Sequence, residues 1–227
     1  MIDISNTKVC GWEMAIRGMR NALNSWDKSD SVFADDEWLL HTSPEIQNVY
    51  TFDPQCDYGH IGENDLKLMH KLCCAGPDHA KFRRMIDVYV DIKAPLYWWK
   101  ETDTYKVGTV RCSCSTMHTI TNKEFTVDDF SHEHLTVISE AVMVEVCRVL
   151  NTWRALYLES KDKEDWWQII QLLPSSYNQQ ATLQLNYEVL SRIYHARKDH
   201  KLDEWHVFCD WIETLPHADA VITGSKA

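Results

Sequence analysis

Residues Met85–Lys93, with the sequence MIDVYVDIK, carry the pattern that decides the fold. Apolar and polar side chains alternate along this stretch, which is the periodicity of a β-strand with one buried face. Its apolar face consists of Ile86, Val88, Val90 and Ile92. The opposite, polar face predicts that solvent or a ligand site borders the sheet on one side. A helix is predicted to follow, because Pro95 suits a first helical turn.

The rest of the chain has mainly helical periodicity. Apolar residues recur three and four positions apart, as on the buried face of an amphipathic helix. The segments predicted as helices are 12–26, 64–75, 96–105, 131–160, 164–173, 179–200 and 202–214. Residues 107–120 are predicted as a loop that enters a second strand. The pattern therefore predicts an α+β protein in which helices dominate.

The predicted helix over 179–200 places two polar residues on one face. Asn186, Leu190, Ile193 and Arg197 are separated by four, three and four positions. Eleven residues make about three helical turns, so Asn186 and Arg197 are expected to project in the same direction, roughly 16 Å apart. The same spacing also describes a boundary stripe whose two polar ends meet water, and the pattern alone leaves both interpretations open.

Length and charge exclude several classes of protein. The chain has 227 residues, a length that one domain over residues 1–227 can account for. Asp and Glu total 34 against 23 Lys and Arg, a formal charge of −11 that disfavours a broad nucleic-acid surface but allows a local cationic pocket for a small phosphorylated ligand. No apolar stretch approaches the ~20 residues that a membrane helix needs, and the N-terminal residues lack the apolar core of a secretory signal. We therefore expect a soluble, cytoplasmic protein.

The eight cysteines raise the question of a metal site. Structural zinc sites usually require two close pairs of ligands, and no such double pair is present. We therefore expect no metal and reduced, partly buried thiols. The pairs considered are Cys56 with His60, Cys73 with Cys74, and Cys112 with Cys114.

Several residues resemble, in order and spacing, the flavin-dependent thymidylate synthases. The resemblance covers about residues 75–212 with almost no gap. It rests on His79, Phe82, Lys93–Ala94–Pro95, Leu173–Pro174, Asn186 and Arg197. It implies the fold of that family, with a mainly antiparallel sheet flanked by long helices. It also implies a homotetramer, because the family builds its sites from several subunits, with Trp98–Trp99 and Trp166–Trp167 as candidate apolar interfaces.

The resemblance also implies ligands and roles for individual residues. Cofactor binding, with FAD as the cofactor, is assigned to His79, Tyr105, Lys106 and Asn186. Binding of a pyrimidine nucleotide is assigned to Glu101, Thr109, Arg111 and Arg197. Arg197 is also the catalytic residue, since the matching arginine of the family supports activation of the pyrimidine. NADPH and methylenetetrahydrofolate are implied only if the family reaction is retained.

The signature motif of the family is largely replaced. Its pattern, R-H-R-x-x-S-x-N-E-x-S-x-R-Y, is occupied here by Thr104, Tyr105, Lys106, Thr109, Arg111, Cys112, Cys114, Thr116 and Met117. Ile170 stands where the family has an arginine before Leu-Pro, and Glu188 stands in place of a cation after Asn186. These replacements remove cationic contacts to phosphate groups, so we expect thymidylate synthesis to be very slow or absent.

Other residues near the motif have two interpretations. A thiolate of Cys112 or Cys114 beside Lys106 or Arg111 would be a nucleophile, whereas the bland alternative is that two small residues fill space. Trp98 and Trp99 are predicted as core, with stacking on a nucleobase as the alternative. Arg83–Arg84 is predicted at a rim.

Two functions follow from the resemblance and its departures. The first is a divergent synthase-like protein that binds a pyrimidine nucleotide and FAD, with reductive methylation of a uracil nucleotide as the family-type reaction. The second is a non-catalytic nucleotide-binding or interaction protein on the same scaffold.

Overall fold

A computed structural model of the chain describes residues 1–33 and 59–224. Their contacts divide into two compact units. Unit 1 comprises residues 1–3, 92–104 and 111–182. Unit 2 comprises residues 4–91, 105–110 and 183–227. The expectation of a single domain stays a prediction, and Cys56, one of the zinc candidates, lies outside the described residues.

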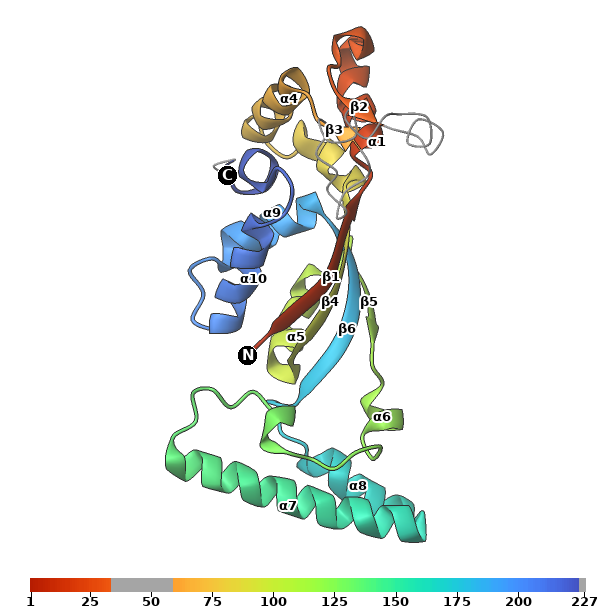
Figure 1. The fold of residues 1–227 in the computed structure, drawn as a ribbon, viewed down its shortest axis with the longest axis vertical. Coiled ribbons are helices and arrows are strands. Elements are labelled where there is room, and N and C mark those ends of the chain that lie inside the picture. Colours follow the sequence, from red (N-terminus) through yellow and green to blue (C-terminus); the bar gives the residue numbers. More distant parts are fainter. Residues whose placement is uncertain (34–58, 225–227) are drawn as a thin grey trace, which may run out of the picture. The chain divides into compact units, whose positions relative to one another are not determined.

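One four-stranded antiparallel sheet has the strand order β1-β4-β6-β5 (Figure 1). Its strands are β1 (Asp3–Cys10), β4 (Asp87–Pro95), β6 (Asn178–Asn186) and β5 (Val110–Ser113). Strand β4 confirms the strand predicted from the alternating pattern. Val88, Val90 and Ile92 are buried, while Tyr89 is exposed. The predicted second strand within 107–120 is β5. With helices as the larger part of the structure, the α+β fold class is confirmed.

Strand β6 corrects the prediction of one long helix over 179–200. Alternate residues Ala181, Leu183 and Leu185 are buried, so this stretch follows the two-residue period of a strand. Only Tyr187–Arg197 forms a helix, α9. Asn186 is its N-cap, and its side-chain oxygen accepts a hydrogen bond from Val189 N at 3.1 Å. Asn186 and Arg197 therefore mark the two ends of α9, and the expectation that they project in the same direction stays a prediction.

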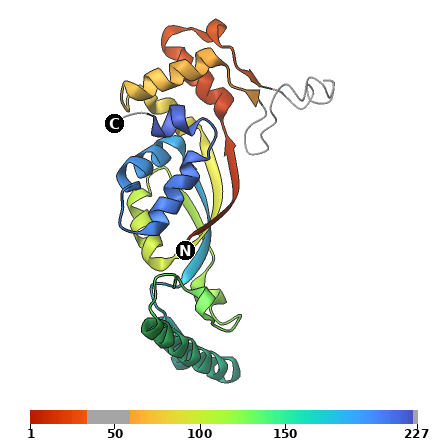
Figure 2. The ribbon, with the colours of Figure 1, turned by 60° about the vertical axis from the view of Figure 1, so that its left-hand side comes forward.

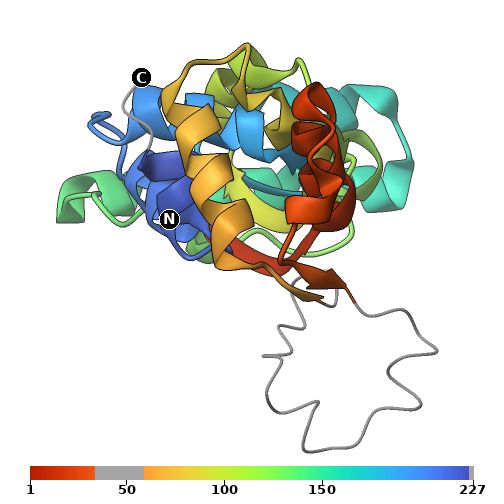
Figure 3. The same cartoon turned by 90° about the horizontal axis from the view of Figure 1, so that it is seen from above.

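Unit 2 is built largely of helices. Figure 2 and Figure 3 show α1 (Trp12–Arg20) and α4 (Glu63–Cys74) toward the same end of this unit. The unit also contains α10 (Asp203–Glu213), which packs against α9. Its shorter elements are the 3₁₀ turns η1 (Asn21–Leu23), η2 (Trp26–Lys28) and η3 (Ala80–Met85), the π turn η6 (Asp219–Thr223), and the pair β2 (Val32–Phe33) and β3 (Gly59–His60). The predicted helix over 12–26 thus ends at Arg20 and continues in short turns.

Unit 1 has a separate apolar core under two packed helices. Figure 1 shows α7 (Val137–Ser160) and α8 (Lys163–Leu172) packed along one another. The core residues are Ile120, Phe125, Phe130, Cys147, Leu150 and Ile169. The remaining elements of this region are α5 (Leu96–Thr102), η4 (Asp103–Tyr105), α6 (Thr116–Thr119) and η5 (Val127–Asp129). The helix predicted over 131–160 begins six residues later, because Thr136 is its N-cap and Asp129 instead caps η5.

A buried ion pair joins α1 to α4 in unit 2. Asp65 is fully buried and Arg20 is 5% exposed. Asp65 accepts a hydrogen bond from Arg20 Nε at 2.6 Å, and its other oxygen accepts from the hydroxyls of Ser29 and Ser31 at 2.6 and 2.7 Å. Burial alone would raise the pKa of Asp65, but the hydrogen bonds and the guanidinium charge outweigh it and lower the pKa. The carboxylate is therefore the charged centre that holds residues 29–31 against α4.

Within residues 1–33 and 59–224, no helix is both long and apolar enough to cross a bilayer.

Replacing Asp65 is expected to destabilise the protein strongly. Asp65→Ala leaves the buried Arg20 without its carboxylate, and breaking a buried pair in this way costs about 3–5 kcal/mol. Urea denaturation followed by circular dichroism measures the loss. Glu63→Gln is the control, because the pair that Glu63 makes with Lys67 is exposed and its loss is expected to cost less than ~1 kcal/mol.

The same carboxyl group gives this stability a pH dependence. Because its pKa is lowered in the folded protein, the stabilisation is complete above the ordinary value of 3.8 and disappears as the pH falls through the lower folded value. The difference in unfolding free energy between the natural protein and Asp65→Asn should therefore shrink in acid. A difference that stays constant from neutral pH into acid would contradict the role given to Asp65.

Candidate functional site

A short loop lies against helix α9 in unit 2. It begins at Tyr105, which is buried, and is closed by Thr109, whose hydroxyl donates to the Tyr105 carbonyl at 2.8 Å. Gly108 has φ +82°, a conformation that favours glycine, and a Cβ atom there would lie 3.1 Å from Val189 Cγ2 and 3.4 Å from Asn186 Nδ2. The loop therefore approaches the N-terminal end of α9 at Gly108.

Arg197, at the other end of α9, contacts the beginning of the same loop. Its Nε donates a hydrogen bond to the Tyr105 hydroxyl at 2.9 Å. The guanidinium carbon lies 5.6 Å from the centre of the Tyr105 ring and 4.9 Å from that of Trp205, on α10. These distances are within the range of cation–π contacts. The structure thus brings together Tyr105 and Arg197. The family resemblance had implied cofactor binding for Tyr105 and nucleotide binding for Arg197.

The other residues assigned to the cofactor are less closely gathered. Lys106 follows Tyr105 and is exposed. Asn186 uses its side-chain oxygen to cap α9. His79 is exposed at the start of η3, and within the described part of the chain no hydrogen bond or ion pair joins its ring to another side chain. Of these three, only Asn186 lies beside the loop, through its approach to Gly108.

Two of the residues assigned to the substrate belong to unit 1. Arg111 pairs with Asp103 at 3.3 Å, lies over the Trp99 ring at 5.2 Å and donates to the Trp99 carbonyl at 3.5 Å. Glu101 is half-buried on α5. Trp98 and Trp99 are 0% and 3% exposed, which agrees with their interpretation as core. Arg111 is therefore already engaged by its own unit.

Glu188 and Arg83 form a pair that sequence reasoning missed. Arg83 is 5% exposed, so its predicted place at a rim is wrong. Its guanidinium lies 4.0 Å from the Glu188 carboxylate and donates to the Ser191 hydroxyl at 3.3 Å. Glu188 and Ser191 are one helical turn apart on α9, so their side chains can contact the same partner, and this spacing is visible in the sequence. Glu188 stands where the family has a cation, and its negative charge therefore lies beside the buried Arg83.

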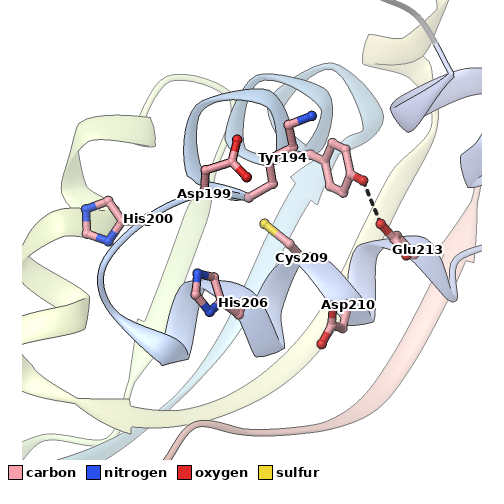
Figure 4. A pocket seen from close by; sticks show the side chains of 8 residues that line it. Tyr194, Asp199, His200, His206, Cys209, Asp210 and Glu213 are labelled. Carbon is pink, nitrogen blue, oxygen red and sulfur yellow. Dashed lines mark hydrogen bonds between the residues drawn. The ribbon is translucent and has the colours of Figure 1, made fainter.

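A cavity of about 530 Å³ lies along α9, α10 and the turn that joins them (Figure 4). Its lining is Tyr194, Lys198, Asp199, His200, His206, Cys209, Asp210 and Glu213. The Tyr194 hydroxyl donates to Glu213 at 2.6 Å, and this hydrogen bond raises the pKa of Tyr194 to about 12. Burial, with the nearby Asp210 charge, raises the pKa of Cys209 to about 12. The cavity is therefore acidic, and its thiol stays protonated near neutral pH.

Cys112 and Cys114 are exposed in unit 1. Cys114 borders two cavities of about 330 and 240 Å³, and its sulfur lies 3.7 Å from the Thr119 hydroxyl. Neither Lys106 nor Arg111 makes a hydrogen bond or ion pair with either thiol among the residues described. Neither of the two cations expected to activate a thiol is thus paired with one, while Lys123 lines both of the cavities that Cys114 borders. Among residues 1–33 and 59–224, no three His, Cys, Asp or Glu side chains form a group that could hold a metal ion.

Thiol chemistry distinguishes these cysteines. Iodoacetamide near pH 8, followed by peptide mapping, should modify Cys112 and Cys114 in the folded protein. It should leave Cys209 at least tenfold slower, because that thiol is 4% exposed and its pKa is raised. Modification in denaturant, where all the thiols become equivalent, is the control. Rapid folded-state modification of Cys209 would show that its surroundings are open.

Comparison with known proteins identifies the fold. No protein-family model matches the chain, and no curated protein matches it in sequence. Among solved structures, thymidylate synthase X from Helicobacter pylori with FAD and dUMP is similar at TM-score 0.66 and 15% identity, over 98% of this chain and 97% of that one. A UMP/dUMP methylase, PolB from Streptomyces cacaoi, bound with 5-Br dUMP, is similar at TM-score 0.55 and 11% identity, over 99% and 95% of the two chains.

The similarity spans nearly the whole length of both proteins in each comparison. It shows that the chain has the fold of the flavin-dependent thymidylate synthases, as the resemblance in sequence implied. Identities of 11–15% establish the fold alone, so the chemistry has to be argued from the residues of this chain.

Proposed function

We propose that this protein binds a pyrimidine nucleotide through Arg197. The observation that carries the proposal is the guanidinium at the end of α9, hydrogen-bonded to Tyr105 and in cation–π contact with Trp205. The similar structures hold dUMP and 5-Br dUMP, which supports a uracil nucleotide as the ligand class. Arginine suits this ligand, because its planar donors can meet a carbonyl oxygen or a phosphate.

The surrounding charges favour a ligand with few phosphates. Lys106 is an exposed cation in the same loop as Tyr105 and is the proposed phosphate contact. Arg111 and Glu101 belong to unit 1, where Arg111 is engaged by Asp103 and Trp99. Thr109 uses its hydroxyl to close the loop. A nucleoside monophosphate therefore suits the cations that remain better than a more highly charged nucleotide.

Flavin binding is supported more weakly by this chain. The Tyr105 ring is 7% exposed and packed against Trp205, and the Asn186 oxygen caps α9, so neither is disposed to form a flavin cradle within the chain. His79 is exposed and is the residue proposed to contact FAD, because Lys106, the other exposed residue of this set, is assigned above to the phosphate of the nucleotide. FAD binding stays a proposal because the similar structures hold FAD. A flavin band in the visible spectrum of the purified protein tests it.

The two candidate functions differ in turnover. In the family-type reaction, a reductive methylation that also consumes NADPH and methylenetetrahydrofolate, Arg197 would stabilise negative charge that develops on the pyrimidine. The non-catalytic alternative, nucleotide binding without turnover, is favoured by Thr104, Thr116 and Ile170, which replace three arginines of the family pattern. We propose nucleotide binding as the retained property and thymidylate synthesis as lost.

A homotetramer is part of this proposal. Trp98 and Trp99 are core residues, so they do not form the interface suggested from sequence. Exposed apolar side chains instead gather on the N-terminal half of α7, where Val137 and Ile138 are 83% and 80% exposed and Val142 and Val144 are also exposed. Exposed apolar patches often mark association surfaces, and this half of α7 is the surface we propose for subunit contacts.

Removing Arg197 is expected to weaken nucleotide binding. Arg197→Ala should reduce the affinity for dUMP or UMP by about tenfold or more, because it removes a charged hydrogen bond worth at least ~1.5 kcal/mol. Isothermal titration calorimetry measures the change. Arg192→Ala is the matched control, because Arg192 is an exposed arginine on the same helix. Equal affinities of a folded Arg197→Ala variant and the natural protein would remove Arg197 from the site.

Thymidylate synthesis should be very slow or absent. Each lost arginine contact costs roughly 1.5–3 kcal/mol, and three partly additive losses predict a defect of about a thousandfold or more. The assay is tritium release from 5-tritiated dUMP with FAD, NADPH and methylenetetrahydrofolate, beside complementation of a thymidine auxotroph. Robust turnover in both would show that the altered motif is an alternative catalytic solution.

A further inference from the structure

The contacts of Arg197 come from residues that the family resemblance does not connect with it. Tyr105 occupies the position of the motif histidine, and Trp205 lies on the next helix. Both side chains are buried, at 7% and 0% exposure, and their rings meet edge to face at 6.1 Å between centres. The two rings are thus a fixed surface within unit 2, and the guanidinium lies against both.

We propose that Tyr105 and Trp205 are positioning residues that hold the Arg197 guanidinium in its ligand-binding orientation. The inference rests on the nucleotide binding proposed above and adds a role for two residues. An unrestrained arginine has many side-chain conformations, and ordering it on binding costs affinity. Contacts that restrict the guanidinium before the ligand arrives remove part of that cost.

The hydrogen bond fixes one edge of the guanidinium. Nε donates to the Tyr105 hydroxyl at 2.9 Å, so this donor is directed at the loop. The guanidinium carbon lies 4.9 Å from the centre of the Trp205 ring, and this contact limits the movement of the group away from the ring. A guanidinium held by both contacts suits an acceptor such as a pyrimidine carbonyl or a phosphate oxygen.

This role also explains how Tyr105 is accommodated in the altered motif. A tyrosine hydroxyl can accept a hydrogen bond from Nε while the ring supports the guanidinium, so one side chain makes both contacts. Thr109 anchors the Tyr105 carbonyl, which ties the backbone of the loop to the same arrangement. Tyr105 is therefore assigned to the arginine and not to stacking on a flavin.

A double-mutant cycle separates positioning from general stability. Tyr105→Phe keeps the ring and removes the acceptor, and it should weaken dUMP binding by about tenfold in calorimetry. In an Arg197→Lys background, which lacks Nε, the same change should have little further effect. Tyr194→Phe is the matched control, because its hydroxyl bonds to Glu213, and it should leave the affinity unchanged. Equal losses in both backgrounds would assign Tyr105 a merely structural role.

A second measurement needs no ligand. In protein labelled with ¹⁵N-arginine, the Arg197 Nε–H signal is identified by its absence in Arg197→Lys, and its hydrogen exchange is measured. Tyr105→Phe should speed this exchange by about tenfold, Trp205→Phe should also speed it, and Tyr194→Phe should not. Unchanged exchange in both site variants would overturn the inference. Slow, Tyr105-dependent exchange without any dUMP binding would retain the positioning role and reject the proposed function.

Discussion

The hydrogen bond from Arg197 to Tyr105 is the contact on which the candidate site depends. It ties the start of the loop to the C-terminal end of α9, while Gly108 approaches the N-terminal end beside Asn186. The loop is therefore fixed at both ends of one helix. A motif that has lost most of its charged residues keeps a defined backbone path in this way, because the arrangement rests on aromatic packing, a helix cap and one glycine.

The replaced charges are accommodated within the chain in different ways. Glu188 faces Arg83, and Arg111 is held by Asp103 and Trp99, so both are neutralised locally. Lys106 remains exposed in the loop. A net charge of −11 makes a strongly anionic ligand unfavourable, which is the physical reason for choosing a monophosphate.

The elements that the sequence predicts correctly are those in which apolar residues recur with a single period. Strand β4 alternates without interruption, and α4 and α8 match their predicted ranges within one or two residues. The prediction of one helix over 179–200 is wrong because a strand runs directly into a helix there. Residues 186–197 fit a helical period, but the alternation of apolar residues at 181, 183 and 185 is that of a strand. Asn186, as an N-cap before Tyr187, was the boundary signal.

The candidate site could be predicted only in part for a similar reason. Family spacing located Tyr105 and Arg197, but their mutual contact depends on tertiary packing that no local pattern encodes. The burial of Arg83 and the exposure of α7 are likewise properties of the folded chain. Spacing thus identified positions, and packing determined which of them act together.

The most direct test of the account is a crystal structure of the protein grown with dUMP. The account predicts density for the nucleotide against the Arg197 guanidinium, with the Nε–Tyr105 hydrogen bond intact and Lys106 near the phosphate. A nucleotide bound elsewhere, with Arg197 making no contact to it, would contradict the central claim.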